Sequence, residues 1–302
     1  MKSKKVGERG FIFTFEDPYK TNVYIIDTEK YLFICDTFLG NRPMEEIMNF
    51  LRNEIGIKTR FHLVFNSHYD YDHVWGNGYF KDKNSLIFSH QLCRKNLLEM
   101  GDESLEKYKS HKRGRVELTL PNLTFTKNLI FNEENLEFSY TPGHTNDSSS
   151  CYDAIDKSLF VGDNIEFPFP YIRTLELDKF IETLSKYLDY DVQYLITGHT
   201  NLIEGEETAK IIKDQLNYVK NFNQNIVDLN NFNLPEKLIH LSNLKEYGNL
   251  LQTNNQEEKA LIYFKESLSL LNTLPEETKG KVDELHKIKD LIVKLEGKIN
   301  NT

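Results

Sequence analysis

Hydrophobic residues in the first forty positions fall in short runs that are typical of β-strands. Residues 11–40 hold three such runs, FIFTF, NVYIID and YLFICD, which are rich in β-branched and aromatic side chains. Turn formers such as Asp17-Pro18 separate them, and together they predict a β-meander. From Pro43 to about Gly56 the apolar residues recur at spacings of three and four instead, and that spacing predicts a helix.

Strand patterns and helix patterns then alternate as far as residue 231. Short apolar runs bounded by turn formers indicate the strands, and spacings of three and four indicate the helices. We predict strands at 62–66, 86–90 and 194–199, a strand-rich stretch at roughly 115–162, and helices at 91–107, 176–189 and 205–231.

The pattern changes at an asparagine-rich segment that ends at Pro235. We therefore predict two domains, residues 1–234 and residues 235–302. The second shows only helical periodicity, with a last helix from about Lys281 to Ile299. Several of its residues fall at the spacings of one tetratricopeptide unit. They are Leu244, Tyr247, Gly248, Leu251, Ala260, Phe264 and Leu268.

A single unit of this kind cannot bury its own apolar face, because repeat arrays generally need about three units. The segment 235–302 is therefore expected to dock on the main domain, on a second copy in a homodimer, or on a protein partner. A generic helical hairpin that resembles a tetratricopeptide unit by chance is the alternative.

Composition and charge narrow the possible partners. The net charge of −9 gives no general attraction to nucleic acid or to anionic membranes. The longest apolar runs are far too short to span a bilayer, and the N-terminus lacks the apolar stretch of a signal peptide. Cys35, Cys93 and Cys151 are widely spaced, which fits free thiols in a reducing compartment. We expect a cytoplasmic protein that acts on a small-molecule substrate.

The segment HYDYDH carries the chemistry. Four potential metal ligands, His68, Asp70, Asp72 and His73, occur within six residues just after a predicted strand. On a loop from strand to helix, the first two can point to one side and the last two to the other. This arrangement suits two metal ions a few ångström apart, as in paired-metal hydrolases. The alternative is a polar loop that is merely rich in turn formers.

Three further candidate ligands follow in similar local contexts. His144 lies in TPGHT after a predicted strand, Asp163 ends the apolar run LFVGD, and His199 ends TGH at another strand end. A glycine precedes each of them, and it lets the backbone approach a metal without a side-chain clash.

The order of these motifs resembles the metallo-β-lactamase superfamily over roughly residues 11–232. That family has His-x-His-x-Asp-His, then a lone His, a bridging Asp and a final His. The resemblance implies an α/β fold, a four-layer αββα sandwich of two sheets with helices outside, here with a small all-α C-terminal segment appended. The resemblance also implies a dinuclear metal centre. The first metal would be held by His68, Asp70 and His144, and the second by Asp72, His73 and His199. Asp163 would bridge the two metals, and Asp36 would support the site from below.

Asp70 departs from the family pattern, which usually has His there. Members that resemble phosphorylcholine esterases or DNA-uptake nucleases carry this Asp form, and flavodiiron proteins carry Glu. A carboxylate makes the first site harder and more anionic. Zinc remains the expected metal at the two sites, with manganese or iron as alternatives, and the bound hydroxide should be less acidic than in a His-rich site.

The resemblance implies a metal-dependent hydrolase with Asp72 as a catalytic residue. Two divalent ions lower the pKa of a bridging water, and the hydroxide attacks an ester, thioester, lactone or phosphodiester. Cytoplasmic location and Asp70 both point away from β-lactam hydrolysis. Two alternatives remain, a di-iron redox protein suggested by Asp70, and a protein-interaction module with a vestigial site.

Residues near the motifs have open roles. Tyr69 and Tyr71 are candidates for the pocket wall, whereas Trp75 is expected to pack on the core. The loop 167–173 is a candidate cover for the site, with Tyr171 or Arg173 touching substrate. His62 and His90 are expected to have structural roles, and His111 is expected to lie on a solvated face. His240 and His286 lie in the helical C-terminal segment, and no partner is assigned to them. Cys151 is expected to be a buried thiol.

Overall fold

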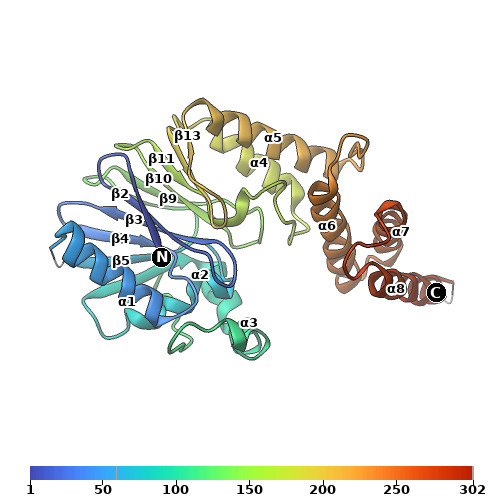
Figure 1. Cartoon of the computed structure of the whole chain (residues 1–302), viewed down its shortest axis with the longest axis horizontal. Coiled ribbons are helices and arrows are strands. Elements are labelled where there is room, and N and C mark those ends of the chain that lie inside the picture. Colours follow the sequence, from blue (N-terminus) through green and yellow to red (C-terminus); the bar gives the residue numbers. More distant parts are fainter. Residues whose placement is uncertain (59, 301–302) are drawn as a thin grey trace.

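Two β-sheets lie face to face in the computed structural model, which describes residues 1–58 and 60–300 (Figure 1). The first sheet has the order β1-β2-β3-β4-β5-β6-β7 and the second has the order β13-β12-β11-β10-β9-β8. The strands of the first are β1 Lys2–Val6, β2 Gly10–Phe15, β3 Thr21–Asp27, β4 Tyr31–Cys35, β5 Phe61–Asn66, β6 Ser85–His90 and β7 Leu123–Phe125. Those of the second are β8 Asn128–Phe131, β9 Leu136–Tyr140, β10 Ser149–Asp153, β11 Ser158–Phe160, β12 Tyr194–Ile196 and β13 Ile203–Glu204.

Helices cover the outer face of each sheet (Figure 1). Those on the first sheet are α1 Asn41–Phe50, the single turn α2 Tyr71–Val74, and α3 Gln91–Lys107. Those on the second are α4 Leu177–Tyr187 and α5 Glu206–Asn223. Three further helices follow at the C-terminal end, namely α6 Leu234–Thr253, α7 Glu257–Thr273 and α8 Lys281–Ile299. Short turns of other helix types occupy Leu51–Ile55, Trp75–Tyr79, Lys109–His111 and Gly162–Asn164.

Three apolar layers hold the sandwich together. The layer between the sheets is aromatic, and Phe138 lies 4.9 Å from Phe65 and 5.8 Å from Phe33, ring centre to ring centre. A second layer joins α1 to the outer face of the first sheet, and a third joins α4 and α5 to the second sheet. Burying one such side chain contributes about 1.5–3 kcal/mol. The predicted four-layer αββα sandwich is confirmed.

Parallel strand pairs bring distant loops to one edge of the sandwich. In the first sheet β4 and β5 run parallel with Cys35 opposite Phe65, so the residues that follow both strands leave the sheet together. In the second sheet β11 and β12 run parallel with Phe160 opposite Ile196. Because the carboxyl ends of parallel strands share an edge, the loops after all four strands face one another there.

The C-terminal helices extend the apolar layer over α5. Helix α6 begins with a capping box between Asn233 and Glu236, in addition to a proline in its first turn. Phe222 of α5 packs edge-on against Tyr247 at 5.5 Å, and the same cluster continues through α7 and α8. The segment is helical as predicted, and its kinship to tetratricopeptide repeats stays a prediction. None of the helices in the described ranges combines the length and hydropathy needed to cross a bilayer.

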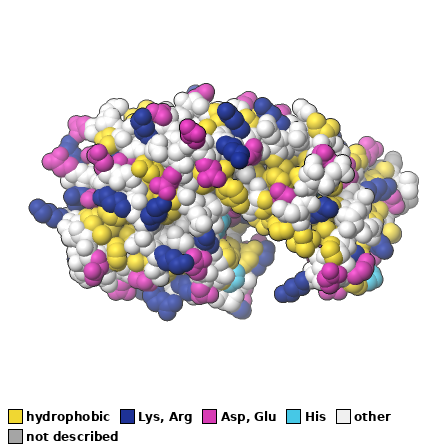
Figure 2. Space-filling view, turned by 45° about the horizontal axis from the view of Figure 1, so that its top comes forward, with side chains coloured by type: hydrophobic (Ala, Val, Ile, Leu, Met, Phe, Trp, Pro, Cys, Tyr) yellow, Lys and Arg dark blue, Asp and Glu magenta, His cyan; other side chains and the backbone are white. Residues whose placement is uncertain are grey.

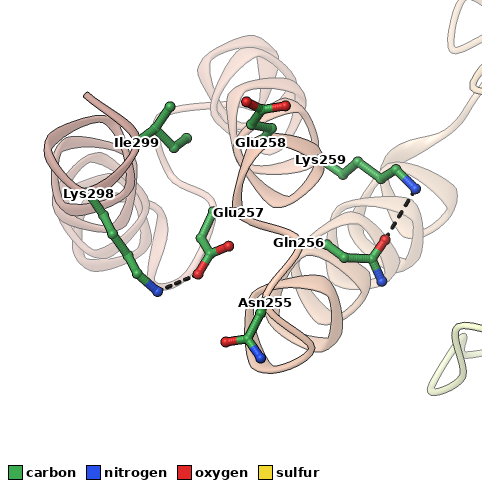
Figure 3. A pocket seen from close by; sticks show the side chains of 7 residues that line it. All are labelled: Asn255, Gln256, Glu257, Glu258, Lys259, Lys298 and Ile299. Atoms are coloured by element: carbon green, nitrogen blue, oxygen red, sulfur yellow. Dashed lines mark hydrogen bonds and ion pairs between the residues drawn. The ribbon is translucent and has the colours of Figure 1, made fainter. Parts of the chain in front are cut away.

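A pocket at the far end of these helices lies between the α6–α7 turn and the end of α8 (Figure 3). Lys259 Nζ donates to Gln256 Oε1 at 3.1 Å, and Lys298 pairs with Glu257. None of the described residues that line this pocket is a histidine or a cysteine. Its chemistry is that of a solvated surface, so it does not compete with the histidine-rich edge as a candidate site.

One predicted helix is shorter in the structure, and one strand of the structure was not predicted. The helix predicted over 205–231 ends at Asn223, because Asn225 takes a left-handed backbone with φ of 55° that α-helices do not continue through. Strand β1 was not predicted, since Lys2, Lys4 and Lys5 give it a polar appearance. It pairs along the edge with β2 and exposes those lysines.

His240 of α6 is expected to make the stability of the metal-free protein fall in acid. It is buried between Phe222 and Phe232, and burial lowers its pKa from 6.5 to about 4. The unfolded chain therefore binds the proton first, and stability is lost as the pH falls from about 6.5 to about 4. At 1.36 kcal/mol per pKa unit, the loss is about 3 kcal/mol.

The measurement is denaturant unfolding of the metal-free protein and of a His240→Gln variant at pH 7 and pH 4. The difference between their free energies of unfolding should shrink by about 3 kcal/mol at the lower pH. Other titrating groups are shared by both proteins and cancel. Equal pH dependence in the two would contradict the assignment.

Candidate metal centre

The predicted ligands all lie at the edge where the four parallel strands end. His68 follows β5, and Asp70 immediately precedes α2, which carries the next two ligands. His144 lies in the loop after β9, Asp163 in the turn after β11, and His199 after β12. The structure thus brings together all seven residues: His68, Asp70, Asp72, His73, His144, Asp163 and His199.

The seven residues fall into two groups on either side of Asp163. In the first group, Asp70 Oδ2 lies 3.5 Å from His68 Nε2 and 3.4 Å from His144 Nε2. In the second, Asp72 Oδ2 lies 3.6 Å from His73 Nε2 and 3.4 Å from His199 Nε2. These are the spacings that ligand atoms around one small cation have, since each would lie about 2.0–2.2 Å from it.

Asp163 lies between the two groups. Its Oδ2 is 3.6 Å from His68 Nε2, 3.3 Å from His73 Nε2 and 3.2 Å from His199 Nε2. The same oxygen lies 4.0 Å from His144 Nε2. A single carboxylate in contact with imidazoles of both groups has the position that a bridging ligand needs.

Each imidazole is oriented by a second partner on its other nitrogen. His73 Nδ1 contacts Asp36 Oδ2 at 2.7 Å, His199 Nδ1 contacts the carbonyl of Lys20 at 2.7 Å, and His144 Nδ1 contacts the carbonyl of Tyr171 at 2.9 Å. A carbonyl or carboxylate accepts from an Nδ1–H, which leaves the Nε2 lone pair facing the centre. Metal-binding histidines are held in this way.

Asp36 supports the site from below, at the end of β4. It is fully buried and accepts hydrogen bonds from Ser67 N and Ser67 Oγ, both at 2.7 Å, in addition to its contact with His73. Ser67 Oγ lies 3.0 Å from His68 Nδ1, so Asp36 orients one histidine directly and another through a hydroxyl.

An Asp36→Asn variant is expected to lower metal affinity by roughly 10–100-fold, because outer partners of metal ligands have effects of that size. The amide keeps the shape but removes the negative charge behind His73. Competition with a chromophoric chelator measures the affinity. A variant with unchanged affinity would mean that Asp36 serves only the fold.

The carboxylates of the centre attract positive charge, either protons on the imidazoles or metal ions. Burial opposes ionisation of these groups, but their mutual attraction outweighs it. It holds the pKa of Asp163 well below its usual range, raises the pKa of His73 well above its own, and raises the pKa of His199 to about 10. Without metal, the carboxylates therefore favour protonated imidazoles at His73 and His199. Metal ions would replace those protons, so metal binding should weaken as the pH falls.

Two buried atoms in the middle of the centre test whether metal ions fit. His68 Nε2 and Asp163 Oδ1 have no hydrogen-bond partner among the described residues. Buried polar atoms are almost always paired, and a bound cation would pair both. Imidazole and carboxylate donors suit zinc, manganese and iron. The residues present therefore fit two divalent ions.

A cavity of about 430 Å³ opens onto the centre, lined in part by Tyr19, Lys20 and Tyr71. The loop after Asp163 forms another part of its wall through Tyr171 and Arg173. Arg173 pairs with Asp70 and donates to Tyr69 Oη at 2.9 Å. The structure thus places Tyr171 and Arg173 of the 167–173 loop beside the site, and the role of this loop as a cover stays a prediction.

Helix α6 reaches the same region from the C-terminal segment. A second cavity of about 340 Å³ lies between α3, the 167–173 loop and α6, and the molecule is hollowed between the two-sheet body and the C-terminal helices (Figure 2). Asn243 of α6 accepts from Ile172 N at 3.0 Å and donates to the Pro170 carbonyl at 2.9 Å. The C-terminal segment therefore fixes the loop that carries Arg173.

The other aromatic and histidine residues take the following positions. Trp75 is buried in the core, as predicted, and His90 is a buried residue that accepts from Leu92 N at the start of α3. His111 was predicted on a solvated face, and that is wrong. Its Nδ1 lies 2.9 Å from Tyr71 Oη, because the chain after α3 turns back toward the site. Cys151 is a buried thiol, as predicted.

Sequence reasoning missed Glu166. This residue is buried, lines the cavity, and offers a carboxylate oxygen within 4.8 Å of ligand atoms of Asp163 and His199. Burial, with repulsion from Asp163, raises its pKa to about 7. The one available signal was its place three residues after Asp163 and directly before the apolar run at 167–170.

Comparison with known proteins agrees with this architecture. The family model of the metallo-beta-lactamase superfamily matches residues 17–199. A solved metallo-β-lactamase from Pontibacter korlensis is 16% identical, with a TM-score of 0.58 over 73% of this chain and 99% of that one. The metallo-β-lactamase DIM-1 is 18% identical, with a TM-score of 0.58 over 73% and 97%. One from Hirschia baltica is 18% identical, with a TM-score of 0.55 over 72% and 96%.

No curated protein matches the chain. At these identities the solved structures show the fold alone, whereas the family model covers more than half of the chain and includes every one of the seven predicted ligands. The chain belongs to the metallo-β-lactamase superfamily.

Proposed function

We propose that this protein is a hydrolase that depends on two divalent metal ions and cleaves an ester, thioester, lactone or phosphodiester of a small molecule. The observation that carries the proposal is the orientation of the imidazoles. Three of them direct Nε2 at the centre while Nδ1 is held by Asp36 or by a backbone carbonyl. A vestigial site would have no reason to keep that orientation.

The proposed ligand set follows the two groups of contacts. His68, Asp70 and His144 would hold the first ion, and Asp72, His73 and His199 the second, with Asp163 between them. When bound, two such ions supply a water of lowered pKa as nucleophile and polarise the bond to be cleaved. Zinc is the metal we propose first, with manganese or iron as the alternatives that the Asp70 carboxylate favours.

The chain's own residues supply binding and orientation. Asp72 is proposed as the catalytic residue that accepts the proton of the attacking water at its carboxylate. Arg173, stacked 5.7 Å from the ring of Tyr69, is proposed to bind an oxygen of the substrate, because its guanidinium lines the cavity beside the ligands. The open cavity admits a small molecule and leaves room for the leaving group.

The division into residues 1–234 and 235–302 also stays a proposal. The apolar layer runs without interruption from α4 and α5 into α6, α7 and α8, so we propose that the second segment docks permanently on the first. Ile262, Val282 and Val293 remain exposed on α7 and α8 and are the residues through which a second copy or a protein partner would bind. With three buried free thiols, we propose a cytoplasmic location.

The first experiment is elemental analysis of the full-length protein purified without added metal, with assays on p-nitrophenyl acetate and bis-p-nitrophenyl phosphate. We expect about two equivalents of metal per chain. Activity on one of the esters should disappear with a chelator and return with zinc or manganese. The choice of ester separates carboxyl from phosphoryl chemistry.

Two outcomes would count against this function. Two irons with no turnover of either ester would favour the di-iron redox alternative. A protein that binds no divalent metal at all would show that the histidine cluster is structural, and the C-terminal helices would then become the first place to seek a function.

A further inference from the structure

We infer that Glu166 is an additional ligand of the second metal ion and gives that site five protein ligands. The inference rests on the proposed function, because it assumes that Asp72, His73, His199 and Asp163 hold a divalent ion. It adds a residue outside the seven that the motifs identify. It also favours a metal with more ligands than tetrahedral zinc requires.

The position of Glu166 supports this role. Its carboxylate oxygen, a ligand atom of Asp163 and a ligand atom of His199 all lie within 4.8 Å of one another. Two ligands on opposite sides of a small ion are separated by about 4.0–4.4 Å, which is close to this upper limit, so a small adjustment would let the three donors share one cation. The residue lines the same cavity as Asp72 and His199.

The burial of Glu166 supplies an independent observation. The residue is 5% exposed, and its Oε2 has no hydrogen-bond partner among the described residues. Leaving such a buried acceptor unpaired is unfavourable, and more so when it is charged. The nearby Asp163 carboxylate repels a charged Glu166 and so adds to the cost of burying it. A cation between the two carboxylates would satisfy the free oxygen and remove the repulsion.

The charge of the ligand set changes with this residue. Asp70, Asp72 and Asp163 carry three negative charges, and Glu166 supplies a fourth, which balances two divalent ions. Five donors of which three are carboxylates would suit manganese, because this ion takes more oxygen donors than tetrahedral zinc does. Mn²⁺ is therefore the probe for the second site.

Metal titration of the metal-free full-length protein tests this inference. Mn²⁺ binding is followed by electron paramagnetic resonance of the free ion, and Zn²⁺ binding by competition with a chelator. In Glu166→Gln, the amide keeps the shape and removes the charge. We expect one of the two Mn²⁺ sites to weaken at least roughly 100-fold, because even outer partners of metal ligands have effects of 10–100-fold. The affinity for Zn²⁺ should fall less.

A matched control is Glu182→Gln in α4, an exposed glutamate outside the cavity. It should bind both ions as the unaltered protein does. Folding is checked on the metal-free proteins, where Glu166→Gln should unfold at the same temperature or higher, since it removes a repulsion. A lower unfolding temperature that metal does not change would give Glu166 a purely structural role and overturn the inference.

The outcomes distinguish a failure of the Glu166 inference from a failure of the proposed function. If the unaltered protein binds two Mn²⁺ and Glu166→Gln does so with the same affinities, the inference is overturned and the proposed function stands. If the unaltered protein binds fewer than two divalent ions of either kind, both fall together.

Discussion

Replacing Asp163 with asparagine is expected to lower hydrolytic activity by at least about 10³-fold and to remove metal from both sites. The carboxylate contacts imidazoles of both ligand groups through one oxygen, Oδ2, and no other carboxylate of the described residues has such contacts to both groups. Losing the interaction of a bridging charge with two ions should amount to several kcal/mol, and each 1.36 kcal/mol is a factor of ten in rate.

Elemental analysis and turnover of the most reactive ester measure this effect. Asp191→Asn is the control, because Asp191 is exposed and pairs with Lys157 at 2.5 Å far from the centre. That variant should keep its metal and its activity. If Asp163→Asn kept two ions and more than a tenth of the activity, the bridging position would be wrong and the two groups would have to act separately.

Replacing Gly198 with alanine is expected to weaken metal binding and turnover by more than about 10²-fold without unfolding the protein. A methyl group at this position would lie 2.0 Å from Asp163 Oδ1 and 2.9 Å from His73 Cε1. The backbone cannot move away, because Gly198 N donates to the Gly162 carbonyl and its own carbonyl accepts from Asn22 N, both at 2.8 Å. The carboxylate must shift instead, and a displacement of about 1 Å can cost 10²-fold.

The control is Gly297→Ala in α8, where an added methyl group would meet none of the described residues within 4 Å. Alanine also favours a helix over glycine by about 1 kcal/mol. The control should therefore bind metal normally and be no less stable. Normal metal affinity in Gly198→Ala would show that the backbone at this edge of the second sheet can move despite its two hydrogen bonds.

The two variants test two different requirements of the metal centre. Asp163→Asn removes a charge and keeps the shape, whereas Gly198→Ala keeps every charge and changes the space. If both lose metal, the site depends on charge and on the close approach of the turn after β12 to Asp163. This close approach is possible because Gly198 has no side chain.

Much of the fold could be predicted from the sequence because the signals are local. The helix predicted over 91–107 is α3 with the same bounds, since its apolar residues repeat within the element itself. The four-layer arrangement followed from the order of motifs, which is a property of the family. Helix α5 ended earlier than predicted because the backbone turn at Asn225 is a single-residue event that periodicity does not report.

The sequence by itself determined which residues are the candidates for the chemistry. A metal ligand needs a particular side chain at the end of a strand, and both features are written locally in HYDYDH, PGH, VGD and TGH. Only the tertiary structure decided what surrounds those ligands. Arg173 pairs with Asp70, Asn243 hydrogen-bonds to the 167–173 loop, and Glu166 lies near Asp163. The distances between these residues depend on the path of the loops and on the docking of α6. No repeat or spacing encodes such distances, because they are set by packing between elements far apart in the chain.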